Sequence, residues 1–151
     1  MRLLFFLFAL GLGGQLWAAP VAEAEMKALY VYNFAQFTAW PVTARESFLF
    51  CTLGDDSVAQ AMRRFDGRSL RGLQVRVARL TGTAGIERCD VLFVGEREAS
   101  VLPQVHAELR EAPVMTVTDA LSNLAGFQLS LEGTRLIFDV NLEACRRANL
   151  I

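Results

Sequence analysis

The chain has 151 residues, of which 53% are hydrophobic, and its 15 basic and 16 acidic residues give a net charge of −1. This length is enough for one domain with a single hydrophobic core. The balanced charge and the lack of a basic block exclude nucleic acid as an expected partner.

Residues 1–24 have the pattern of a secretory signal peptide. Arg2 precedes the continuous apolar run Leu3–Leu12, and small residues follow that run. The run is too short to span a bilayer, so we expect no membrane insertion after cleavage, which would fall after Ala24 or after Ala18. The mature protein is then expected in the periplasm, and an uncleaved N-terminal anchor is the alternative.

A helix is predicted over Lys27–Pro41, KALYVYNFAQFTAWP. Its apolar residues recur at steps of three and four, so one broad face should be buried against the rest of the domain. The proline should end the helix, because a residue that precedes proline avoids the helical region. The apolar positions of this face are Met26, Leu29, Tyr30, Phe34, Phe37 and Trp40.

Strands and helices alternate through the middle of the chain. Strands that are apolar on both faces are typical of a buried parallel sheet, whereas Leu73–Leu80 alternates apolar and basic residues and should be half open to solvent. The predicted buried strands are Ser47–Leu53, Cys89–Val94 and Pro113–Val117, and the predicted helices are Ser57–Phe65 and Glu98–Glu111.

The C-terminal part predicts a β-hairpin and a last helix. Phe127–Leu131 and Arg135–Val140 alternate in period two around a turn at 132–134. A short helical turn is expected at Thr118-Asp119, and an asparagine-capped helix at Asn141–Leu150. The fold class is therefore α/β: a three-layer, Rossmann-like domain with a mostly parallel sheet, helices on both faces and the hairpin at one side.

Three cysteines follow the leader: Cys51, Cys89 and Cys145. In an oxidising compartment two of them can pair, and one is left over. Cys51 and Cys89 could pair if their strands are neighbours, because a disulfide needs Cα atoms about 4.4–6.8 Å apart. Cys145 is either buried and inert or exposed and able to link two chains, and we favour a buried or half-buried position.

No catalytic motif is present, and neither an enzyme, a cofactor nor a metal site is expected. His106 is the single histidine and is expected on the solvent side of its helix. The carboxyl ends of parallel strands are the usual ligand position in such a sheet, although turn and cap roles are the alternative. The candidate ligand crevice comprises Gly54, Asp55, Gly95, Glu96, Thr118 and Asp119.

The stretch KALYVYNFAQFTAWP resembles the opening of the YfiR-like family of periplasmic regulators. The resemblance extends over residues 25–151, but the family's leucine-rich last helix is missing here, and Cys145 stands where many relatives have a small apolar residue. Further matching segments are Cys51–Gly54, Cys89–Phe93, Phe138–Leu142 and Arg146–Ala148.

The resemblance implies that Cys51 and Cys89 form a disulfide, either a structural staple or a redox-sensitive clamp. It also implies a non-enzymatic repressor that binds the periplasmic sensor domain of a YfiN-type membrane diguanylate cyclase. Such binding lowers cyclic-di-GMP and biofilm growth, and self-association as a homodimer is compatible with it. The alternatives are a periplasmic small-ligand-binding protein that passes a signal to a membrane partner, and a redox-responsive or structural envelope domain.

Overall fold

The computed structural model describes residues 22–42, 45–54 and 57–151. Residues 1–21 of the signal peptide expected at 1–24 lie outside the described residues, and so do Asp55 and Asp56. Within the described ranges, no helix is both long enough and apolar enough to cross a membrane.

The helical elements lie at both ends of the chain and between the strands. Three of them are single short 3-10 segments, of which two extend a neighbouring α-helix. The helical elements in chain order are α1 (Glu23–Phe37), α2 (Ser57–Met62), η1 (Arg63–Phe65), η2 (Ile86–Arg88), η3 (Glu96–Val101), α3 (Leu102–Leu109) and α4 (Leu142–Arg147).

The described strands form one sheet in the order β2-β3-β1-β4-β5-β6-β7. The five strands from β3 to β6 pair in parallel, and the two outermost pairings, β2 with β3 and β6 with β7, are antiparallel. The α/β prediction with a C-terminal hairpin is confirmed. The strands are β1 (Ser47–Leu53), β2 (Ser69–Leu70), β3 (Leu73–Leu80), β4 (Val91–Val94), β5 (Met115–Thr118), β6 (Phe127–Glu132) and β7 (Arg135–Val140).

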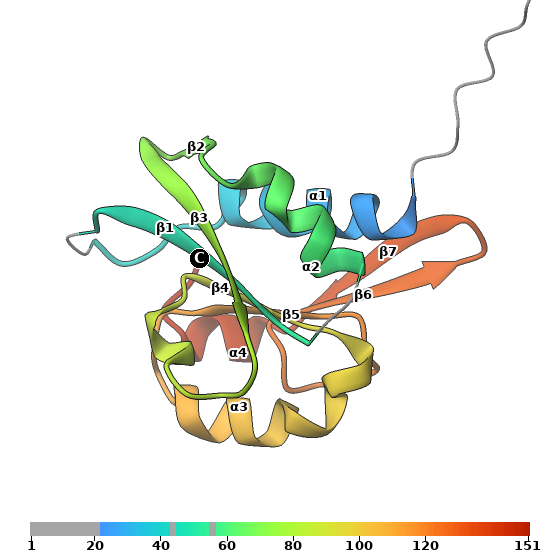
Figure 1. The fold of residues 1–151 in the computed structure, drawn as a ribbon. Helices are drawn as coiled ribbons and strands as arrows, with labels where there is room; N and C mark the ends of the chain where they lie inside the picture. The colour runs from blue at the N-terminus through green and yellow to red at the C-terminus, as the bar shows by residue number, and fades with distance from the viewer. Residues whose placement is uncertain (1–21, 43–44, 55–56) are drawn as a thin grey trace, which may run out of the picture.

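Helices cover both faces of this sheet, as the buried strands require. Figure 1 shows α1 and α2 above the sheet and α3 and α4 below it. The two faces have separate cores: Phe48, Phe50 and Phe93 belong to the one that includes α1, while Leu92 and Val105 belong to the one that includes α3. β1 and β4 therefore send alternate side chains into different cores.

α1 ends at Phe37, four residues before Pro41, so the predicted end is wrong. Thr38 is already extended, with φ −80° and ψ 139°. Ala39 then exchanges two backbone hydrogen bonds with Ile151, at N···O distances of 2.7 and 3.2 Å. The helix stops because its next residues join this backbone pairing, which a local sequence pattern does not reveal.

The buried face of α1 also differs from the prediction. Ala28, Val31 and Ala35 are fully buried, whereas Leu29 and Phe37 are 48% and 83% exposed. The small side chains let the helix lie close to the sheet, so the larger ones are turned away from it. Met26, Tyr30, Phe34 and Trp40, also expected on the buried face, are partly buried against the core.

Other predicted elements also differ from the structure. β4 begins at Val91 rather than at Cys89, which follows η2. Thr118 and Asp119 lead into a series of bends and not into a helical turn. The predicted cap of the last helix is confirmed, since the Asn141 side chain accepts from two backbone N–H groups of α4.

Candidate functional site

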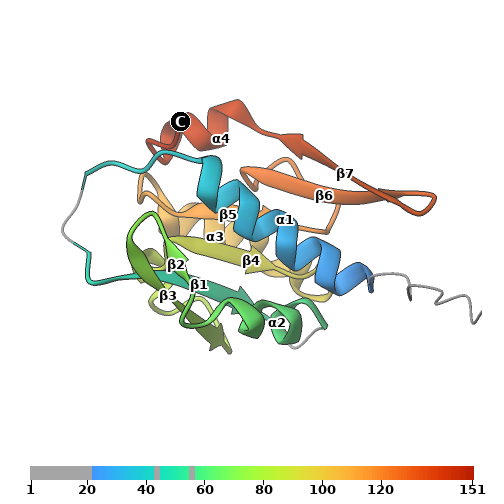
Figure 2. The same cartoon turned by 90° about the horizontal axis from the view of Figure 1, so that it is seen from above.

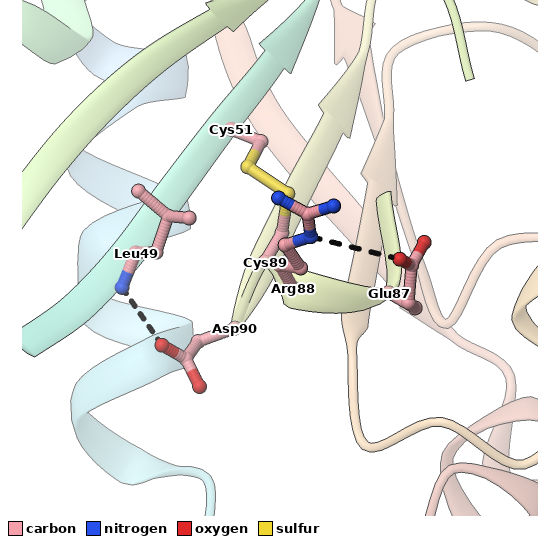
Figure 3. The surroundings of a disulfide bond; sticks show 6 residues. All are labelled: Leu49, Cys51, Glu87, Arg88, Cys89 and Asp90. Atoms are coloured by element: carbon pink, nitrogen blue, oxygen red, sulfur yellow. Dashed lines mark hydrogen bonds and ion pairs between the residues drawn. A yellow bond between two sulfur atoms is a disulfide. The ribbon is translucent and has the colours of Figure 1, made fainter. Parts of the chain in front are cut away.

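A disulfide joins Cys51 of β1 to Cys89, which lies two residues before β4 (Figure 3). The Cα atoms are 5.9 Å apart, and the bond closes a loop of sequence separation 38. Both cysteines are in the α3-side core, with residue exposures of 1% and 4%. The bond therefore holds the start of β4 against β1 from inside the core.

Asp90 makes a second link between the same two segments. Its backbone N–H donates to the Leu49 carbonyl at 2.8 Å, and its Oδ2 accepts from the Leu49 N–H at 2.7 Å (Figure 3). Its other oxygen, Oδ1, forms an ion pair with Arg45 Nη1 at 2.8 Å. The sequence analysis did not identify this buried carboxylate. The available signal was an acidic residue placed between a cysteine and a buried strand.

Burial raises the pKa of Asp90, although the Leu49 N–H and the Arg45 charge act in the opposite direction. The unfolded chain therefore loses its proton at lower pH than the folded chain. The free energy of unfolding should consequently fall as pH rises from about 3.8 towards the raised pKa.

We expect Asp90→Asn to remove that pH-dependent fall, because an amide does not ionise. An amide oxygen can still accept from Leu49, so the substitution should cost less than Asp90→Ala, for which we expect a loss of about 1–3 kcal/mol. Urea unfolding at several pH values between 3.5 and 7 would measure both effects. Equal pH slopes for the wild type and Asp90→Asn would show that Asp90 does not cause the fall.

The candidate ligand crevice lies at the carboxyl ends of β1, β4 and β5. Asp119 Oδ1 accepts from the Glu96 N–H at 2.7 Å, and the Thr118 hydroxyl donates to the Val94 carbonyl at 2.8 Å. Gly54 has φ +104°, and a Cβ there would lie 2.8 Å from the Glu98 side chain. The described crevice residues thus contact one another or their neighbours, and Asp55 lies outside the described residues.

Lys27 of α1 binds to the same edge. Its Nζ lies 2.8 Å from Asp119 Oδ2 and 2.5 Å from Glu23 Oε1. Burial, the largest single effect, lowers the pKa of Lys27, but the hydrogen bonds and charges of Asp119 and Glu23 outweigh it and leave the pKa raised. At neutral pH the charged Lys27 ammonium therefore links α1 to Asp119 at the end of β5. The Asp119 carboxylate of the crevice is thus already paired with a group of the protein itself.

His106 is not on the solvent side of its helix, contrary to the prediction. It is half-buried, and its Nε2 lies 2.6 Å from Arg147 Nη1 of α4. Because an arginine side chain can only donate, the histidine nitrogen accepts this hydrogen bond. His106 thus links α3 to α4. In residues 22–42, 45–54 and 57–151, no group of three or more His, Cys, Asp or Glu side chains could hold a metal ion.

Cys145 is half-buried on α4. Its Sγ lies 3.8 Å from the Gly126 carbonyl, and a Cβ added at Gly126 would lie 3.3 Å from that sulfur. Burial raises the pKa of the Cys145 thiol, which keeps it protonated and weakly nucleophilic. This environment is that of a packed side chain.

The outward side of α1 carries large apolar side chains. Leu29 and Phe37 are large and apolar, and the polar Asn33 lies between them at the same four-residue spacing, on the side of the helix opposite Ala28 and Val31. We call these three residues the α1 outer face. Seen from above, α1 lies across the strands, and no other labelled element is drawn over it (Figure 2). Apolar side chains on a helix that nothing in the described chain covers are typical of a protein-binding surface.

Comparison with known proteins identifies the family of the chain. A sequence profile of the family described as YfiR/HmsC-like matches residues 24–151, which include every described strand and both disulfide cysteines. No curated protein matches the chain significantly.

Proposed function

Because the chain belongs to the YfiR/HmsC-like family, we propose that it binds the periplasmic sensor domain of a membrane diguanylate cyclase and holds that enzyme inactive. The family is one of periplasmic regulators of the diguanylate cyclase system. Inhibition of the cyclase lowers cyclic-di-GMP and reduces biofilm growth. The family match over residues 24–151 is the observation that carries the proposal.

The α1 outer face is the surface that we assign to the cyclase. Phe37 is 83% exposed and Leu29 is 48% exposed, on a helix whose opposite side is already buried. Aromatic side chains with this exposure supply much of the energy at protein interfaces when a partner covers them. A sensor domain with a complementary apolar groove would remove both side chains from water.

The contacts beneath this surface hold it in one conformation. Lys27 fastens the first half of α1 to Asp119, and the Phe34 ring stacks on Phe127 with centroids 4.6 Å apart. A helix that is already ordered loses little conformational freedom on binding. The surface is therefore preformed, as an inhibitor that acts by docking requires.

The disulfide lies in the other core, on the α3 side of the sheet, where it is shielded from solvent. Reduction requires a thiolate to reach a sulfur, but Cys51 and Cys89 are 1% and 4% exposed. Redox control of the cyclase would then act through local opening and loss of stability, not through a bond accessible in the native state.

The small-ligand alternative finds less support. At the candidate crevice, Asp119 is engaged by Lys27 and by the Glu96 N–H, so a ligand would first have to displace these contacts. A surface depression of about 400 Å³ does lie beside the disulfide, lined by residues such as Arg45, Arg88 and Asp90. Its Arg45–Asp90 ion pair already neutralises part of its charge.

We expect Leu29→Ala combined with Phe37→Ala to raise the Kd for the purified cyclase sensor domain by about tenfold or more. Alanine keeps the helix propensity high, so the change removes contact area without unwinding α1. Isothermal titration calorimetry would measure the affinity, and circular dichroism would verify the fold.

Leu121→Ala is the matched control. Leu121 is 94% exposed but belongs to the bends after β5 and not to α1. Its truncation should leave the affinity unchanged. Wild-type affinity in the α1 double variant would move the binding site elsewhere, and no binding by the wild type would overturn the proposed function itself.

A further inference from the structure

α3 and α4 both lie below the sheet (Figure 1), and a small pocket opens between them. Its volume is about 30 Å³. A pocket of this size has room for about two water molecules. Leu102, Val105 and Leu109 of α3 form part of its wall and belong to the α3-side core. The pocket is therefore a narrow opening with an apolar floor.

Three basic side chains complete the lining of this opening, which we call the α3–α4 pocket. His106 lies on α3, Arg110 directly follows that helix, and Arg147 lies on α4. Arg147 Nη1 is 2.6 Å from His106 Nε2. The other residues of the described lining are apolar apart from Thr116, so no carboxylate faces the three basic groups.

The two arginines of this pocket lack a counter-charge. In residues 22–42, 45–54 and 57–151, neither Arg110 nor Arg147 forms an ion pair with an acidic side chain. By contrast, Arg45 contacts Asp90 at 2.8 Å. Arg110 also has φ +50°, a backbone conformation that destabilises any residue other than glycine. Two like charges and a strained backbone are thus held beside one small opening.

Stabilisation of the helix ends is the alternative role for these residues. His106 and Arg147 lie in the last turns of their helices, where a positive charge interacts favourably with the helix dipole. That role explains a basic residue at each helix end. It does not explain why Arg147 contacts a histidine nitrogen instead of solvent or a carboxylate.

We propose that the α3–α4 pocket binds a small soluble oxyanion of the sulfate or phosphate type, with Arg147, Arg110 and His106 as hydrogen-bond donors. A guanidinium group presents several N–H donors in a fixed plane, which match two oxygens of one oxyanion. Two such oxygens occupy the space of about two water molecules, so the volume of the pocket suits them. The bound anion would supply the counter-charge that both arginines lack.

His106 couples anion binding to pH. In the structure its Nε2 accepts from Arg147, so that nitrogen carries no proton to donate. When the imidazole takes up a proton from solvent, Nε2 and Arg147 Nη1 both donate, and an oxyanion oxygen between them accepts from both. Proton uptake and anion binding then favour each other by the same factor. The affinity for the anion should therefore rise as pH falls through the range in which histidine titrates, roughly pH 8 to 5.

An NMR titration with sodium sulfate at constant ionic strength tests the site, because the charge of sulfate does not change over this pH range. The wild type should bind about fivefold or more tightly at pH 6 than at pH 8. Arg147→Gln should raise the Kd at pH 6 by about tenfold. His106→Gln should make the affinity independent of pH, because its amide oxygen accepts from Arg147 but cannot take up a proton. Arg146→Gln is the matched control, since Arg146 is exposed on the same helix and does not line the pocket.

Three results would overturn the proposal. The first is a wild type that does not bind sulfate at pH 6, which would leave these residues the role at the helix ends. The second is an equal rise in Kd for Arg146→Gln and Arg147→Gln, which would show a nonspecific charge effect. The third is sedimentation with phosphatidylglycerol vesicles that Arg147→Gln abolishes, without sulfate binding, which would assign the cluster to lipid headgroups. These measurements use the isolated protein, so their outcome is independent of the proposed inhibition.

Discussion

Replacing Cys51 and Cys89 together by alanine should lower the free energy of unfolding by about 4 kcal/mol at most, the largest effect that we expect from any change in the chain. The bond closes a loop of sequence separation 38, and in the chain-entropy model its main effect is to restrict the unfolded chain. For a domain of this size the loss corresponds to a fall in Tm of roughly 10–15 °C. Alanine suits the test because both positions lie in an apolar core.

Differential scanning calorimetry with and without dithiothreitol provides the control. Reductant should lower the Tm of the wild type towards that of the double variant and leave the double variant unchanged. Cys145→Ala should retain the response of the wild type, because Cys145 is a free thiol. Coincident melting curves for the oxidised wild type and the double variant would show that the bond does not stabilise the domain.

Phe34→Ala should lower the free energy of unfolding by about 3 kcal/mol. The Phe34 ring lies at the centre of an aromatic cluster, with centroids 4.6 Å from Phe127, 4.9 Å from Phe138 and 5.9 Å from Tyr30. Its removal leaves a cavity between α1 and the β6–β7 hairpin and loses three ring contacts. Urea unfolding would show a lower midpoint with an unchanged m value.

Phe37→Ala is the matched comparison on the same helix. Phe37 is 83% exposed, so the same truncation should change stability by no more than about 0.5 kcal/mol. Phe34 is therefore expected to contribute stability, and Phe37, three residues further along α1, is expected to contribute partner binding. Equal losses of stability for both variants would contradict this division.

The sheet could be predicted because its signals are local. β1 and β4 are apolar on both faces, and the hairpin alternates in period two around a short turn, so residue patterns alone place these strands. The Asn141 cap was equally local, since it needs only its own side chain and the next helical turn. The pairing of Cys51 with Cys89 followed from the family resemblance, because three cysteines allow several pairings.

The features that sequence reasoning missed depend on contacts distant in the chain. The predicted buried face of α1 was only partly right, because Tyr30 and Phe34 pack sideways against β7 while alanines face the sheet. The helix ended early because Ala39 pairs with Ile151. His106 was assigned to solvent because its partner Arg147 lies 41 residues away.

The central claim, inhibition of a membrane diguanylate cyclase, can be measured directly. The full-length cyclase is reconstituted in nanodiscs, where its periplasmic domain is accessible, and cyclic-di-GMP synthesis is followed as the purified protein is added. We predict a saturable fall in synthesis, shifted to about tenfold higher protein concentration by Leu29→Ala with Phe37→Ala and not by Leu121→Ala. Cyclic-di-GMP synthesis that is unchanged at saturating wild-type protein would contradict the account.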